Sequence, residues 1–246
     1  MYDPEFTEDL NRMTLQVGLV GNDGVVMVSD RLKQSFEHGA RSLSLTSKFF
    51  SNPHLTCCWS GDIVAEYAAN AVAAINNWPA IDSGKESIRA ALIAAGERGW
   101  QQSESTGAQR VNVNRKVMVA FPKTASLWLL EVGQATIANP CLDRQVAGDI
   151  ENTARYFINK YAEGCQKRSI ETLITLAAHV VLAAGEENPH GVDGLEVIVI
   201  PRGGPAVTLS QSQEHDLKEW FKKTRETVSR QLLRPFDYRP VTPPAA

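Results

Sequence analysis

The order of strand-like and helix-like segments is the feature of this sequence that most restricts its fold. Apolar or alternating runs indicate strands, and apolar side chains spaced by three or four residues indicate helices. The expected strands are 15–20, 25–30, 44–50, 55–60, 117–121, 126–132, 135–137, 195–200 and 206–210. The expected helices are 64–75, 88–95, 150–161, 170–181 and 217–228. Strands thus come in blocks, and pairs of helices separate the blocks.

This order excludes a doubly wound fold, in which single strands and single helices alternate. It favours two stacked, mainly antiparallel sheets whose outer faces are covered by helix pairs, which is an α+β arrangement with four αββα layers. The runs 25–28 and 195–200 are almost wholly apolar, as expected for strands that are buried on both faces. We expect one such domain over residues 14–210, preceded by a leader at 1–13 and followed by an amphipathic helix and a Pro-rich tail at 211–246.

Composition excludes several classes of function. The net charge of −3 over 246 residues supplies no basic field for nucleic acid. Four cysteines without metal-ligand spacing indicate free thiols and predict a cytoplasmic protein. The acidic leader has no apolar run, so we expect neither a signal peptide nor a transit peptide, and no membrane association.

Two charged residues stand where burial is expensive. Asp30 ends an apolar strand, and Lys48 stands within another strand beside two phenylalanines. We expect them to pair, because removing one member of a buried pair leaves the other uncompensated, at a cost of about 3–5 kcal/mol. Two interpretations are open: a structural role, either as a salt bridge or with Lys48 extending to solvent instead, or a charged pair that serves a reaction.

Thr14 is the residue at which the Asp30–Lys48 pair could serve a reaction. It follows Met13 and begins the strand that is expected beside Asp30. If Met13 is removed, the Thr14 nitrogen becomes an amine with a reference pKa of about 7.7–8.0, which suits a general base near neutral pH. Nucleophile and base then belong to one residue, and a nearby Lys48 favours the neutral amine.

A family resemblance rests on three stretches: "MTLQVGLVGNDGVVMVSDR", the lysine in "TSKFF", and "WSGDIVAEYAANAV". They resemble the N-terminal half of proteasome β-subunits and related N-terminal nucleophile hydrolases, most of all the small bacterial proteasome homologues. The order of elements is similar through about Ser210, whereas the residue-level likeness ends near position 75.

The resemblance implies a fold, an activity and an assembly. The fold is the αββα sandwich, and the activity is that of a threonine-type endopeptidase acting on peptides or unfolded polypeptides. Thr14 is then the nucleophile, Asp30 holds Lys48, Lys48 tunes the amine, and the Gly61 N–H is the oxyanion donor. The implied assembly is a homo-oligomeric ring, most often stacked in pairs, and the sequence does not decide whether an ATPase serves it.

Three features depart from the family pattern. Gly148 is followed by Asp149 where the family has Gly-Ser, and Asp149 is interpreted either as a helix N-cap or as a neighbour of Thr14. Asp193 stands near the family's second acidic position, although a turn explains it equally well. Met13 replaces the usual glycine before the threonine, so either residues 1–13 are a propeptide or translation begins at Met13, which we favour.

Other reactions find little support. The five histidines show no i,i+4 pairing, no dinucleotide motif is present, and Cys57 lies in an apolar strand that raises a thiol pKa, so no metal and no cofactor are expected. Two functions from different classes remain. The first is a threonine peptidase that acts through an acyl-enzyme on Thr14. The alternative is a weakly active or inactive ring-forming scaffold or binding shell, which Met13 and Asp149 favour.

Overall fold

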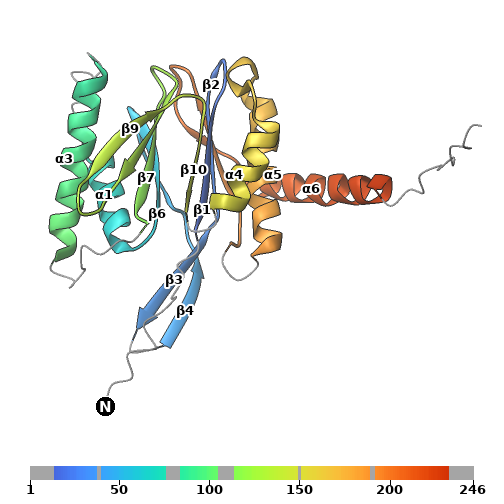
Figure 1. Ribbon diagram of the computed structural model, residues 1–246, viewed down its shortest axis with the longest axis horizontal. Coiled ribbons are helices and arrows are strands. Elements are labelled where there is room, and N and C mark those ends of the chain that lie inside the picture. Colours follow the sequence, from blue (N-terminus) through green and yellow to red (C-terminus); the bar gives the residue numbers. More distant parts are fainter. Residues whose placement is uncertain are drawn as a thin grey trace, which may run out of the picture.

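Two antiparallel sheets lie face to face between two layers of helices (Figure 1). The computed structural model describes residues 14–37, 40–75, 84–104, 114–148, 151–188 and 192–232. Within 34–43 and 230–232 only the backbone is described. The predicted α+β fold class, with four αββα layers, is confirmed.

The first sheet contains the strand that follows Thr14. Its strand order is β10-β1-β2-β11-β12, and every neighbouring pair is antiparallel. The strands are β1 (Leu15–Val20), β2 (Gly24–Ser29), β10 (Arg144–Gly148), β11 (Glu196–Pro201) and β12 (Val207–Thr208). All residues of β1 and β2 are buried, as the apolar character of residues 25–28 predicts.

The second sheet faces the first and has the order β5-β6-β7-β8-β9, again antiparallel throughout. Its strands are β5 (Phe49–Asn52), β6 (Leu55–Ser60), β7 (Lys116–Phe121), β8 (Ser126–Glu131) and β9 (Ile137–Cys141). Side chains that alternate along the strands fill the space between the sheets; Met27, Met118 and Leu127 belong to this inner core.

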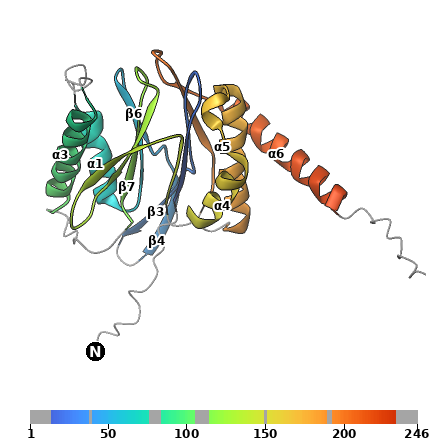
Figure 2. The ribbon, with the colours of Figure 1, turned by 45° about the horizontal axis from the view of Figure 1, so that its top comes forward.

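The outer layers are helix pairs, as Figure 2 shows from a second angle. The pair α1 (Ile63–Ala73) and α3 (Lys85–Glu104) covers the second sheet. The pair α4 (Glu151–Tyr161) and α5 (Ile170–Glu187) covers the first, and the single turn η2 (Cys165–Lys167) joins its helices. Among the described residues, no helix is both long and apolar enough to cross a membrane.

The last helix, α6 (Gln211–Leu232), extends outward from α5 (Figure 1). It is attached through its first half, where Phe221 and Glu214 are buried. Residues 233–246, which include the predicted Pro-rich tail, lie outside the described residues, as does the predicted leader at 1–13.

The prediction of one continuous strand over residues 44–50 is wrong, because residues 44–45 and 49–50 belong to two different strands. Residues 46–48 form a link between β4 (Ala40–Leu45) and β5, and β4 pairs with β3 (Leu32–Glu37) as a separate two-stranded ribbon. Sequence reasoning missed β3, most of β4 and also β10. The ribbon sequence "LKQSFE" is mostly polar, so it lacks the apolar density on which the other strand predictions depended.

Candidate functional site

Thr14 stands at the end of the first sheet, one residue before β1. It is buried, with 4% of its surface exposed. Its neighbour Leu15 lies opposite Gly148 of β10, and the following residue, Gln16, lies opposite Ser29 of β2. The pairing of β1 with β10 and β2 therefore fixes the position of the Thr14 backbone.

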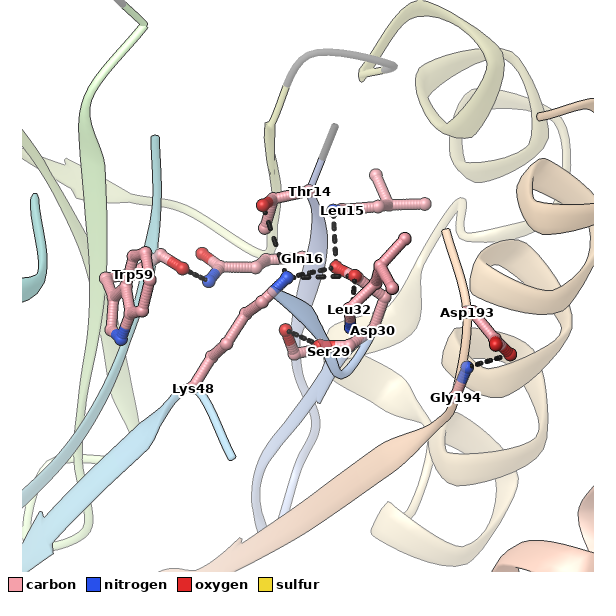
Figure 3. Close-up of polar contacts among 10 residues, drawn as sticks. All are labelled: Thr14, Leu15, Gln16, Ser29, Asp30, Leu32, Lys48, Trp59, Asp193 and Gly194. Carbon is pink, nitrogen blue, oxygen red and sulfur yellow. Dashed lines mark hydrogen bonds and ion pairs between the residues drawn. The ribbon is translucent and has the colours of Figure 1, made fainter. Parts of the chain in front are cut away.

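Lys48 reaches Thr14 from the link between β4 and β5 (Figure 3). Its Nζ lies 3.2 Å from Thr14 Oγ1 and 2.9 Å from each carboxylate oxygen of Asp30. The side chains of Lys48 and Asp30 are 1% and 0% exposed. The predicted Asp30–Lys48 pair is thus present and buried, and it contacts the Thr14 hydroxyl.

Four hydrogen bonds to its carboxylate fix the orientation of Asp30. Besides the two from Lys48, Oδ1 accepts the Leu15 N–H at 2.8 Å, and Oδ2 accepts the Leu32 N–H at 3.0 Å. Burial raises the pKa of Asp30, and Lys48 with these two N–H groups opposes that rise. A charged Asp30 therefore depends strongly on the positive charge of Lys48.

The backbone also holds Asp30 against the Thr14 strand. The Asp30 N–H donates to the Leu15 carbonyl at 3.1 Å, while the Leu15 N–H donates to the Asp30 carboxylate. Lys48 does not sit within a strand, contrary to the prediction. Its place in a link frees its side chain from strand alternation, so the side chain can enter the interior beside Thr14.

Gly61 lies in the turn between β6 and α1. Its φ of +113° is a value that side chains strongly disfavour. The next residue, Asp62, is the N-cap of α1, and its carboxylate accepts the Val64 N–H at 3.0 Å. Gly61 therefore lies directly before the N-cap of α1, at the positive end of the helix dipole.

Gln16 connects the Thr14 strand to the strand that leads to Gly61. Its side-chain Nε2 donates to the Trp59 carbonyl, across the space between the sheets (Figure 3). Sequence reasoning missed this contact, although a glutamine inside an otherwise apolar strand was a signal for it. The contact places the end of β6 next to β1, two residues before Gly61.

A row of polar residues crosses the first sheet beside this contact. Gln16 lies opposite Ser29, and Ser29 lies opposite Glu196 of β11. All three are buried. Gln16 Oε1 and Glu196 Oε2 have no hydrogen-bond partner among the described residues. The space between the sheets is thus polar at the Thr14 end, whereas it is apolar along Met27 and Met118.

Comparison with known proteins supports the fold at this point. The arrangement is similar to a solved structure of a Gly-1 mutant of Anbu from Hyphomicrobium sp. strain MC1, with a TM-score of 0.64 over 92% of this chain and 99% of that one. This likeness shows the fold alone, with its two stacked sheets between helix pairs. The two sequences are 8% identical, and neither a family model nor a curated protein matches this chain.

The fold does not bring every predicted site residue to the Thr14 group. The Asp193 carboxylate accepts the N–H of the following Gly194 at 2.6 Å, and Figure 3 shows it apart from Lys48. Its backbone carbonyl is closer to the site, because it accepts the Arg31 N–H at 2.8 Å, directly after Asp30. The turn interpretation explains these contacts. Asp149 and Met13 lie outside the described residues.

Cysteine and metal-ligating side chains are the remaining candidates for chemistry in this fold. The Cys57 thiol is buried in β6, and burial raises its pKa to about 12, so little thiolate forms near neutral pH. No group of three or more metal-ligating side chains is found among the described residues.

Proposed function

We propose that this chain is an N-terminal threonine hydrolase that cleaves peptide bonds through an acyl-enzyme on Thr14. One observation carries the proposal: the buried Lys48 ammonium lies 3.2 Å from the hydroxyl oxygen of Thr14, which directly precedes the first strand of the fold. Burying a lysine and an aspartate costs desolvation free energy. Buried charged groups of this kind cluster at functional sites, which supports a reaction at Thr14.

In the proposed mechanism, the free amine of Thr14 removes the proton from its own hydroxyl as Oγ1 attacks the substrate carbonyl carbon. Lys48 stays protonated because Asp30 neutralises it at 2.9 Å. Its charge disfavours protonation of the nearby amine and stabilises negative charge on Oγ1. Asp30 acts through Lys48 and does not contact the substrate.

The tetrahedral intermediate places negative charge on the former carbonyl oxygen. The proposed donor to this oxygen is the N–H of Gly61, at the positive end of α1. Collapse of the intermediate breaks the C–N bond, and the Thr14 ammonium returns its proton to the departing amine. Water, deprotonated by the same amine, then hydrolyses the ester and restores Thr14.

The mechanism requires that the bond between Met13 and Thr14 be absent, since an amide nitrogen is not a base. Translation that begins at Met13, followed by removal of that residue, supplies the amine without self-cleavage. Cleavage of a 1–13 propeptide by Thr14 supplies it as well. Asp149 and Asp193 are proposed as neighbours of the site and take no step in this mechanism. The contacts of Asp193 fit a turn.

The proposed substrate is a peptide or an unfolded polypeptide, and the proposed assembly is a cytoplasmic homo-oligomeric ring, stacked in pairs. A ring that encloses its active sites admits extended chains and excludes folded proteins. The alternative, a scaffold of the same shape without activity, has Met13 in its favour, because a chain that retains Met13 has no base.

The proposal is tested by comparing two forms of the same chain. In one form, cleavage of an N-terminal fusion leaves Thr14 as the first residue; in the other, residues 1–13 are retained and intact mass confirms them. We expect the first form to release the fluorophore from members of a panel of short peptide amides and the second to show at least about 10³-fold lower turnover, because its nitrogen cannot accept a proton. Absence of turnover in both forms, with an assembled ring, would support the scaffold.

A further inference from the structure

We infer that Asn114 and Arg115 are positioning residues that hold the Gly61 turn and the Thr14 strand in a fixed relation. The inference rests on the proposed function, in which Gly61 and Thr14 act on one carbonyl group. Asn114 and Arg115 immediately precede β7, and sequence reasoning assigned them no role. They contact both halves of the site through different groups.

The first contact is between backbones at the Gly61 turn. A Cβ atom on Gly61 would lie 2.8 Å from the Asn114 carbonyl oxygen and 3.1 Å from Arg115 Cα. Gly61 therefore packs directly on the Asn114–Arg115 segment. The segment is itself anchored, because the Arg115 carbonyl accepts the Val132 N–H at 3.0 Å.

The second contact is an ion pair beside the same turn. Arg115 Nε lies 2.9 Å from both carboxylate oxygens of Asp62, and Nη2 lies 2.7 Å from Oδ2. The Arg115 side chain is 1% exposed, and its guanidinium also lies 5.6 Å from the centre of the Trp100 ring. Asp62 is thus held by Arg115 while it caps α1, so the residue after Gly61 has one orientation.

The third contact reaches the Thr14 side of the site. Asn114 Nδ2 donates to the Gly148 carbonyl at 3.1 Å. Gly148 has a φ of +128°, and a Cβ atom there would overlap the Thr14 carbonyl oxygen, so only glycine fits against Thr14. The path from Gly61 through Asn114 to Gly148 therefore ends at the backbone of the nucleophile.

Such a bridge matters because the oxyanion forms between the two sides. A donor must lie about 2.7–3.1 Å from the developing oxyanion, and a misplacement of about 1 Å can cost about 10²-fold in rate. Gly61 has no side chain with which to fix its own N–H. The Asn114–Arg115 segment supplies that restraint from the neighbouring strand.

The test compares Arg115→Met and Arg115→Lys with the wild-type chain that begins at Thr14. Lys116→Met is the matched control: it breaks the ion pair between Lys116 and Glu151, at 2.7 Å, one residue further along the chain. Asn114→Ala tests the other half of the bridge. Each variant is measured for kcat and KM on a peptide amide that the wild type cleaves, and for inhibition by a peptide boronate and by a product-like peptide acid.

We expect Arg115→Met to lower kcat by about 10- to 100-fold with KM nearly unchanged, and Arg115→Lys to recover part of that loss. The boronate, whose adduct with Thr14 imitates the tetrahedral intermediate, should weaken by a similar factor, while the product-like acid binds as before. Asn114→Ala should show a smaller effect of the same kind, and Lys116→Met should stay within about twofold.

The outcomes separate this inference from the proposed function. The inference alone is overturned if the wild type is active and the folded Arg115→Lys and Asn114→Ala variants keep its kcat and its affinity for the boronate. Equal losses in Lys116→Met also overturn it, because the effect is then one of general stability. A wild-type chain that begins at Thr14, assembles and has no turnover overturns the proposed function and this inference with it.

Discussion

Thr14→Ala is expected to abolish peptide cleavage in the chain that begins at residue 14. The substitution removes the nucleophile while it leaves the amine, Lys48 and Asp30 in place. We expect turnover to fall by at least about 10⁴-fold, since loss of a nucleophile removes the covalent pathway altogether. The measurement is the steady-state rate on a fluorogenic peptide amide cleaved by the wild type.

Thr14→Ser is the matched control for this change, because it keeps a hydroxyl at the same position. We expect it to retain measurable turnover. Thr14→Ala should alter the free energy of unfolding by about 1 kcal/mol, since Lys48 keeps its two bonds to Asp30 when the Thr14 hydroxyl is lost. Turnover by Thr14→Ala close to that of wild type would show that the hydroxyl is not the nucleophile.

Lys48→Met is expected to have the largest effect on stability and a comparably severe effect on turnover. It leaves Asp30 buried without its counter-charge, which typically costs about 3–5 kcal/mol in the free energy of unfolding. The measurement is denaturant unfolding of the variant and the wild type at several pH values, together with turnover in water.

The pH dependence of this loss has a definite sign. Burial raises the pKa of Asp30, and removal of Lys48 removes the largest opposing interaction, so the pKa rises further in the folded variant. A group with a raised pKa in the folded state stabilises that state at low pH and loses this contribution as pH rises through the folded-state pKa. We therefore expect the stability difference between Lys48→Met and wild type to grow from acidic to neutral pH.

The double variant Lys48→Met/Asp30→Asn separates structure from reaction. With no unpaired carboxylate left, it should recover part of the lost stability, although the asparagine oxygen can accept only one of the Leu15 and Leu32 N–H groups. It should also lose most of the pH dependence. Its turnover should remain low, since no cation then faces the Thr14 hydroxyl. Recovery of both stability and turnover in the double variant would instead mean that the pair is structural.

The αββα layers and the Asp30–Lys48 pair are predictable because apolar runs indicate buried strands and buried charges require partners. The apolar run 25–28 predicts a strand buried on both faces, and β2 is such a strand. An aspartate at the end of that strand and a lysine followed by two phenylalanines predict a pair, because each charge alone would be buried at high cost. The sequence thus indicated both the αββα layers and the contact between Asp30 and Lys48.

The unpredicted parts depend on contacts that no local pattern records. The strands β3 and β4 pair without a strong apolar face, so the alternation of apolar side chains that predicts a strand is too weak to distinguish them from a loop. Asn114 and Arg115 acquire their partners Gly148 and Asp62 only when three distant segments meet. Gly148 shows the same limit, since only the fold reveals that the Thr14 carbonyl occupies the space of its missing side chain.

The most direct test of the central claim is covalent labelling of Thr14 by a peptide epoxyketone, which forms a ring with both the hydroxyl and the amine of an N-terminal threonine. The protein expressed from Met13 is labelled, and intact mass with peptide sequencing locates the adduct. The account predicts one adduct per chain, on a Thr14 that is the first residue, and none on Thr14→Ala. A chain that begins at Thr14, folds and assembles, yet carries no adduct and cleaves no peptide, would contradict it.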